Sequence, residues 1–251
     1  MAGHSHAANI RHRKAAVDKK RSKIFSKIAR RIIVEARLGD PDPETNAALR
    51  LIVETARAAN MPKDVIQRNI DKGAGVGADA VSYEDVVYEG YAQGGVAVMV
   101  EGLTDNRNRT SPEIKKLFER AGGNLGQPGC VGYLFESKAV FLVKGEGKSE
   151  DEVMEAVLDL GAEDMEAVDD GYMITAAPSD FVAIKAGLEE RGFELELAEV
   201  QKLAQNTIEI TDEAQARKVL KLIEALEDHD DVQNVSTNHS LSDELAAKLG
   251  A

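Results

Sequence analysis

The stretch AVFLVKGEGKSEDEVMEAVLDL, residues 139–160, decides the fold of its part of the chain. Its apolar start, 139–143, predicts a strand. Residues 149–160 predict a helix that opens with the capping box Ser149-x-x-Glu152. In a capping box, the two side chains satisfy backbone N–H groups that have no partner at a helix start. A strand followed by a helix is therefore expected here.

The sequence after this stretch adds two strands, a helix and a last strand. Strands are predicted at 165–168 and 172–176, and Asp169-Asp170-Gly171 between them is a hairpin turn. A helix at 180–191, ended by Gly192, precedes a strand at 195–200. The resulting order βαββαβ is that of a ferredoxin-like unit.

The flanking sequence gives the same order, with that unit inserted in it. Before the insert we predict strands at 96–103 and 131–135, with a helix at 112–121 behind the capping box Thr110-x-x-Glu113. An added strand at 86–91 precedes this order. After the insert we predict a strand at 207–210, a helix at 212–226 and a strand at 232–237. The expected fold class is α+β. It has two ferredoxin-like βαββαβ domains, one of residues 80–137 plus 203–240 and one of residues 138–202 inserted in it.

Three helices are predicted before this α+β part. Residues 15–38 alternate apolar and basic positions with a helical period, and Gly39 ends the helix. A second helix is expected at 44–59, and a short third helix follows Pro62 and ends at Gly73. Residues 1–73 should therefore form a basic helical domain with an exposed N-terminal arm.

The charge of the chain is divided unevenly. The 251 residues carry a net charge of −13, which at face value argues against a nucleic-acid partner. Residues 1–72, however, hold 16 Lys or Arg against 8 Asp or Glu, and the remainder carries −21. Residues 1–37 alone carry +9. This split indicates a part that binds polyanions, with a merely solvated helix face as the alternative.

Several functional classes find no support in the sequence. Cys130 is the single cysteine, which excludes an internal disulfide and a multi-cysteine zinc site and fits a reducing compartment. His4, His6 and His12 have no acidic or thiol partner nearby, so we expect no metal and no cofactor. Gly73-x-Gly75-x-Gly77 follows a helix where a dinucleotide loop needs a strand, so it predicts a linker. No convergent set of acid, base and nucleophile is evident, and we expect no enzyme.

Other features bear on location. No apolar run reaches the roughly 18–20 residues of a membrane span, and no apolar signal-peptide core lies near Met1. An Arg-rich, acid-poor N-terminus does resemble a mitochondrial transit peptide. We expect a cytoplasmic protein without a membrane partner or a small-molecule substrate.

Two basic sets are candidates for binding nucleic acid. The first comprises Arg11, His12, Arg13, Lys14, Lys19, Lys20, Lys23, Lys27 and Arg30. Such a set neutralises several phosphates, with affinity that depends strongly on salt. The second is Arg107 and Arg109 in the loop Asp105-Asn-Arg-Asn-Arg109. Asp105 and Asn106 are explained as turn formers, whereas neither arginine has such a local reason.

Linked motifs along the whole chain resemble the YebC/PmpR family. They are Met1-Ala-Gly-His-Ser with Ala8-Asn-Ile-Arg-His-Arg-Lys14, then Ala56-Arg-Ala-Ala-Asn-Met-Pro-Lys-Asp64, Lys72-Gly73, Thr104-Asp-Asn-Arg-Asn-Arg-Thr110 and Gly122-Gly-Asn-Leu-Gly126. The resemblance starts at Met1 itself, which argues against a transit peptide. The sequence departs from the family at His6-Ala7, where a Lys-Trp pair is usual, and at Tyr133, where Trp is common.

The resemblance implies a helical domain followed by two α+β domains and no enzymatic activity. His4, Asn9, Lys63 and Arg68 complete the expected nucleic-acid ligands. Bacterial members are described as DNA-binding transcriptional regulators and as ribosome-associated translation factors, and the mitochondrial relative as a translational activator. We expect foremost a translation factor that binds ribosomal RNA. A DNA-binding transcriptional regulator and a protein-interaction scaffold remain the alternatives.

A long basic strip and the distant Arg107 and Arg109 favour RNA over DNA. A strip of this kind does not form a compact helix-turn-helix, and two distant contacts suit a shaped RNA surface. The −21 of the body would also repel a long polyanion unless it were held away from it.

Overall fold

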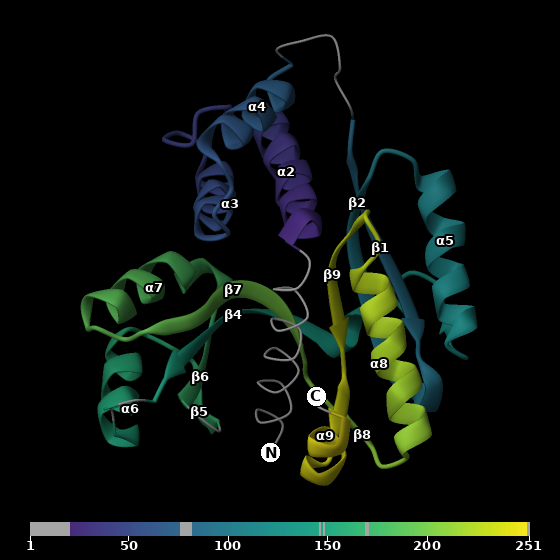
Figure 1. Ribbon diagram of the computed structural model, residues 1–251. Coiled ribbons are helices and arrows are strands. Elements are labelled where there is room, and N and C mark those ends of the chain that lie inside the picture. The colour runs from purple at the N-terminus through teal and green to yellow at the C-terminus, as the bar shows by residue number, and fades with distance from the viewer. Residues whose placement is uncertain (1–20, 76–81, 146, 148, 169–170, 250–251) are drawn as a thin grey trace.

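Helices and antiparallel sheets make up the computed structural model, which describes residues 21–75, 82–145, 147, 149–168 and 171–249. Three helices form one group, and each of two four-stranded sheets carries its own helices (Figure 1). The mixed α+β class expected from the sequence is confirmed. The predicted N-terminal arm and the predicted helix start at residue 15 lie outside the described residues.

The helical unit consists of α2 (Arg21–Leu38), α3 (Ala47–Ala58) and α4 (Lys63–Gly73). α3 begins after Asn46, whose side chain accepts a hydrogen bond from the backbone N–H of Leu49. At Gly73, an added Cβ would lie 2.5 Å from the carbonyl oxygen of Ile33, so glycine allows α4 to approach α2 closely. The unit has a core of its own, made of Ile32, Ala36, Leu49, Val53, Ala56, Met61, Ile66 and Ile70.

The first sheet has the strand order β3-β1-β2-β9, and all its pairs are antiparallel. Two helices cover one face of it, and their apolar residues pack against Val98, Val100 and Val235 (Figure 1). The elements are β1 (Glu84–Tyr91), β2 (Ala97–Thr104), α5 (Arg107–Arg120), β3 (Asn124–Leu125), α8 (Glu213–Glu227) and β9 (Val232–Thr237), with a 3₁₀ turn η1 (Gln93–Gly95) between β1 and β2.

The second sheet has the order β5-β6-β4-β7 and is also antiparallel. Along the chain its elements follow the βαββαβ order read from the sequence. The capping box at Ser149 is confirmed, because its side chain and that of Glu152 make both of the expected bonds. The elements are β4 (Phe135–Lys144), α6 (Glu150–Asp159), β5 (Asp164–Val168), β6 (Gly171–Ala176), η3 (Pro178–Asp180), α7 (Phe181–Glu190) and β7 (Leu195–Ala204).

The strands β4 and β7 run past the predicted boundaries at 138 and 202. Their ladder extends from Phe135 opposite Ala204 to Val143 opposite Leu195. Phe135 and Ala204 pack with Ala97 of the first sheet, whereas the other end of the ladder belongs to the core under α6 and α7. The predicted domain boundaries at 138 and 202 thus fall inside the ladder that joins β4 to β7. The division of the chain into domains stays a prediction.

The predicted strand 131–135 is wrong. Residues Gly132–Leu134 form a 3₁₀ turn, η2, and the strand beside β1 is the two-residue β3. The cause lies across the sheet: the carboxylate of Glu89 accepts the backbone N–H groups of Gly129, Val131 and Gly132, which are therefore unavailable to a ladder.

Two further details also differ from prediction. Helix α5 starts at Arg107 because Asn106, not Thr110, is its N-cap and accepts from the backbone N–H of Arg109. The predicted strand at 207–210 exists as β8 (Ile208–Ile210), yet it pairs in parallel with β10 (His239–Leu241) and lies outside the four-stranded sheet. β10 and the closing helix α9 (Asp243–Leu249) were not predicted.

Candidate nucleic-acid interface

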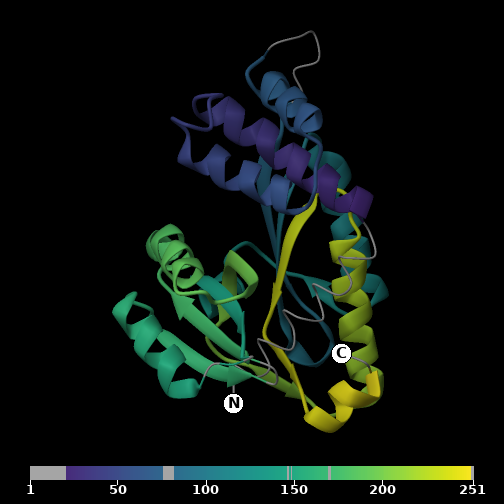
Figure 2. The ribbon, with the colours of Figure 1, turned by 60° about the vertical axis from the view of Figure 1, so that its left-hand side comes forward.

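Lys23, Lys27 and Arg30 of α2 face the C-terminal end of α8, beside which the start of α2 lies (Figure 2). Lys23 Nζ donates to the carbonyl oxygen of Asp228 at 2.9 Å, and Lys27 Nζ donates to that of Glu227 at 2.9 Å. The last carbonyls of a helix have no partner within it and form the negative end of its dipole. The two lysines therefore act as a cap for α8.

One turn further along α2, Arg30 reaches the loop that follows α8. Its guanidinium donates to the carbonyl oxygen of Asp230, and Nη1 lies 2.9 Å from Oδ1 of Asp231. The same guanidinium lies over the ring of Tyr83, 5.8 Å from its centroid. Arg30 is therefore held by three groups, all of them outside the helical unit.

Asp231 is the centre of this contact. Its side chain is 2% exposed, and its Oδ2 accepts bonds from Thr110 Oγ1 at 2.6 Å and Thr104 Oγ1 at 3.2 Å. Oδ2 also lies 2.7 Å from Nη2 of Arg109. Burial by itself raises the pKa of this carboxyl, but the bonds from Thr110 and Arg109 and the charges of Arg109 and Arg30 lower it below its usual value. Asp231 is therefore held as a carboxylate.

Asp231 was not among the residues singled out from the sequence. Its partners Arg30 and Thr110 are 201 and 121 residues away along the chain. No local pattern carries such a signal.

The two candidate arginines of the 105–109 loop are in different situations. Arg109 pairs with Asp231 and with Asp105 Oδ1 at 2.9 Å, and these contacts raise the pKa of its guanidinium. Arg109 thus has the structural reason that the sequence did not reveal. The side chain of Arg107 is 59% exposed, and its Nε lies 4.0 Å from Glu84 Oε2. Arg107 is the more available of the two for a partner.

The candidates on α4 point to solvent. Lys63 and Arg68 are exposed, and Arg68 forms an ion pair with Asp64 at 3.0 Å on the same helix. Arg57 and Lys72 of the helical unit are exposed too. The remaining candidates lie outside the described residues; they are His4, Asn9, Arg11, His12, Arg13, Lys14, Lys19 and Lys20.

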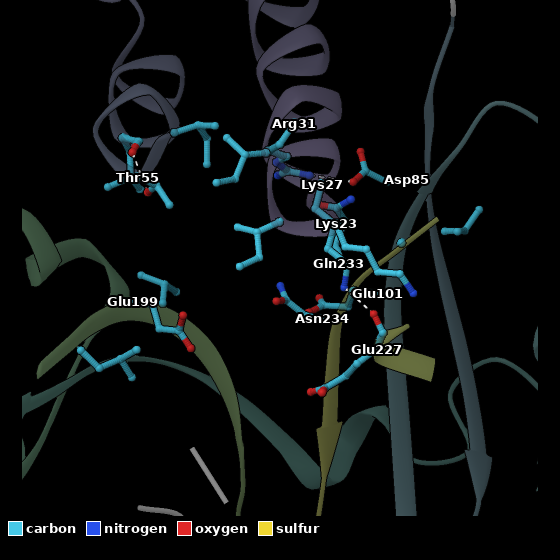
Figure 3. Close-up of a pocket in the computed structure, with 18 of the residues that line it drawn as sticks. Lys23, Lys27, Arg31, Thr55, Asp85, Glu101, Glu199, Glu227, Gln233 and Asn234 are labelled. Atoms are coloured by element: carbon cyan, nitrogen blue, oxygen red, sulfur yellow. Dashed lines mark hydrogen bonds and ion pairs between the residues drawn. The ribbon is translucent and has the colours of Figure 1, made fainter. Parts of the chain in front are cut away.

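A cleft of about 640 Å³ separates the helical unit from the two sheets (Figure 3). Lys23, Lys27 and Arg31 of α2 line one side of it, and Arg31 Nη1 lies 3.0 Å from Asp85 Oδ1 of β1. Carboxylates and apolar side chains line the rest, among them Glu101, Glu199, Glu224, Leu51, Phe181 and Val200. Lys23, Lys27 and Arg31 thus line the cleft and contact the body of the protein directly at its edge.

A second organised feature is the loop held by Glu89. Burial raises the pKa of this carboxyl, whereas the N–H groups of Gly129, Val131 and Gly132 lower it, and the net direction is downward. Tyr91 donates to the carbonyl oxygen of Cys130 at 2.9 Å, and Tyr133 is 70% exposed at the end of the loop. Burial raises the pKa of the Cys130 thiol, so the thiol stays protonated at neutral pH.

The described residues show no metal centre and no membrane span. Nowhere in ranges 21–75, 82–145, 147, 149–168 and 171–249 do three or more His, Cys, Asp or Glu come together in a way that could hold a metal ion. Within the same ranges, every helix is too short or too polar to cross a membrane.

Helices with a basic surface, docked on an acidic body of two antiparallel sheets, define a three-part α+β protein. Comparison with known proteins gives the family. Residues 5–76 match the family described as TACO1/YebC protein N-terminal domain, and residues 83–239 match TACO1/YebC second and third domain. The chain belongs to the TACO1/YebC family.

Relatives match this chain along almost its whole length. A protein of Rubrobacter xylanophilus named "Probable transcriptional regulatory protein" is 49% identical over 249 residues, 99% of each chain. A protein of Aquifex aeolicus with the same name is 47% identical over 250 residues, 100% of each chain. The crystal structure of a conserved hypothetical protein from Aquifex aeolicus is similar with a TM-score of 0.81 at 46% identity, covering 90% of this chain and 93% of that one.

Proposed function

We propose that this protein is a non-enzymatic regulator of gene expression that binds ribosomal RNA and acts on translation. The observation that carries the proposal is the charge division, +9 over residues 1–37 against −21 after residue 72. A basic part attached to an acidic body binds a polyanion at one end while the body is held away from it. The exposed Lys63 and Arg57 extend the basic surface onto the other helices of the unit.

Ultraviolet crosslinking in cells, with bound RNA and bound DNA both sequenced, tests this proposal. We expect ribosomal RNA to be enriched and purified protein to cosediment with ribosomes at moderate salt. Enrichment of DNA alone, without cosedimentation, would refute the proposal.

The second candidate is a DNA-binding transcriptional regulator. The names of the two relatives favour it, and so does one structural detail: residues 59–62 join α3 to α4, a turn of the length found in helix-turn-helix motifs. In such motifs the N-terminal residues of the second helix contact base edges, and here that helix begins at Lys63. Lys63→Ala with Arg68→Ala should then abolish the footprint on a specific duplex.

A further inference from the structure

We propose that the contact of α2 with the end of α8 is a latch, which closes over the basic face of α2 and which a nucleic acid opens by competing for Lys23, Lys27 and Arg30. The inference rests on the proposed function, since it treats these cations as phosphate ligands. It adds a regulation of that site: in the closed protein the cations are already occupied by an internal set of acceptors.

The acceptors in the closed latch are of the kind that phosphate can replace. Lys23 and Lys27 bind main-chain carbonyl oxygens of Asp228 and Glu227, and Arg30 binds that of Asp230. A phosphate oxygen carries a formal charge, and hydrogen bonds between two charged groups are stronger than those to a neutral carbonyl. Exchange of α8 for phosphate therefore replaces these neutral acceptors by a charged one, while Lys23 and Arg30 also give up the carboxylates of Asp228 and Asp231.

A polyanion cannot simply add to the closed latch. The end of α8 carries the carboxylates of Glu227, Asp228 and Asp230, and Asp228 Oδ1 lies 3.6 Å from Lys23 Nζ. A phosphate chain brought to the same cations would meet this negative charge at short range. The carboxylates at the end of α8 and the phosphates of a nucleic acid therefore cannot occupy the same cations together. Competition between them is what the latch requires.

Opening would leave the charge of the buried carboxylate paired. When Arg30 departs, Oδ2 of Asp231 retains its bonds from Thr104, Thr110 and Arg109, all of which belong to β2 and α5. Oδ1 would lose its contact with Arg30 and would meet water instead. A buried charge that lost its last partner would be strongly destabilising, but this one keeps Arg109.

The helical unit is also able to move as a body. Its buried apolar residues form a core of their own, and Leu51 of α3 is the half-buried apolar residue that packs against the core under α6 and α7. The cleft of about 640 Å³ beside Lys23 and Lys27 shows that the unit is not packed tightly against β1 and β7 (Figure 3). Opening therefore breaks the polar contacts of α2 and the apolar contact of Leu51.

A chemical bridge across the latch tests the proposal. Arg31→Cys and Asp85→Cys, in a Cys130→Ser background, place two thiols where an ion pair now joins α2 to β1. A short bis-maleimide closes the latch permanently, and the same protein treated with a monofunctional maleimide is the matched control. The probe is single-stranded RNA of fixed length, with duplex DNA in a parallel series. We expect the bridged protein to bind at least about tenfold more weakly, because apparent affinity falls with the fraction of competent molecules.

A second variant moves the latch in the other direction. Asp85→Asn frees Arg31 from the body without removing any cation of α2, and should tighten RNA binding by roughly two- to fivefold. Asp159→Asn removes the same charge from the ion pair with Arg191, far from α2, and should leave binding unchanged.

The outcomes separate the latch from the proposed function. If bridged and control proteins bind equally, or the bridged protein binds more tightly, the latch is refuted, while weaker binding by Lys23→Ala with Lys27→Ala keeps the function intact. If that double variant binds as wild type does, the shared cations are wrong and the latch falls alone. If wild type binds neither RNA nor DNA, both proposals fail.

Discussion

Arg30 and Arg109 bind different oxygens of one carboxylate: Arg30 Nη1 lies 2.9 Å from Oδ1 of Asp231, and Arg109 Nη2 lies 2.7 Å from Oδ2. One arginine comes from the helical unit and the other from the first turn of α5. Asp231 therefore joins two basic segments that are distant in the sequence, and several tests follow from its position.

Replacing Asp231 by Asn should lower the free energy of unfolding by about 1–3 kcal/mol. The amide removes the negative charge that Arg30 and Arg109 both contact. Its NH₂ group also faces the N–H donors of one of these arginines, to which it cannot act as an acceptor. Urea denaturation measures the difference. Asp230→Asn, an exposed neighbour, is the control and should change stability by less than about 0.5 kcal/mol.

The contribution of Asp231 should depend on pH with a definite sign. Because its pKa is lowered in the folded protein, the stabilisation is complete above the unfolded value of about 4 and is lost as pH falls through the folded value. The stability difference between wild type and Asp231→Asn should thus be constant at neutral pH and shrink below about pH 4. Thermal melts of both proteins over this range measure it, and a difference that grew on acidification would contradict the assigned direction.

Arg107 and Arg109 should separate into a binding and a stabilising residue. Arg109→Ala should lower stability by about 1–2 kcal/mol, because it removes a charged partner of the buried Asp231. Arg107→Ala should leave the melting temperature unchanged and weaken cosedimentation with ribosomes. Equal melting temperatures for the two variants would show that the Asp231 contact contributes little.

Glu89→Gln should loosen the loop that carries Cys130. One carboxylate oxygen becomes an NH₂ group and faces a backbone N–H that it cannot accept. We expect faster reaction of Cys130 with a thiol reagent, both because the loop opens more often and because a charge that raises the thiol pKa is removed. Cys130 is the sole cysteine, so the rate reports one site. Glu136→Gln is an exposed control whose rate should equal that of wild type.

A fragment of residues 138–202, the predicted inserted domain, should fold poorly because its ends cut the ladder between β4 and β7. A fragment of 134–205 keeps the pairs Phe135 with Ala204 and Ser137 with Lys202, which the shorter fragment loses. We expect the longer fragment to melt cooperatively at the higher temperature, as circular dichroism would show. If the shorter one is as stable, the ladder beyond residue 138 does not contribute.

The sequence was sufficient where periodicity or a local cap specifies structure. The helix at 149–160 is an example, because Ser149 and Glu152 are three residues apart and need no distant partner. The helices of the basic unit were found for the same reason, since their apolar stripes follow a 3.6-residue period. Each of these signals lies within one element.

Where contacts between distant segments decide, the sequence was insufficient. Gly129 and Val131 bind Glu89 across the fold, which turned a predicted strand into a loop. The basic face of α2 was interpreted as a binding surface, and nothing local shows that Lys23 and Lys27 cap a helix about 200 residues away. The sequence shows no local role for Arg109, and the structure shows that it forms an ion pair with Asp231.

The paired strands β4 and β7 have a mechanical consequence. Ten residues of β-strand extend for about 33 Å, and two such strands joined by a ladder resist bending along their length. One end of this pair of strands packs beside Ala97 and the other under α6 and α7, so the pair forms a stiff connection between the two sheets. A force applied to α6 or α7 is thereby transmitted to the first sheet.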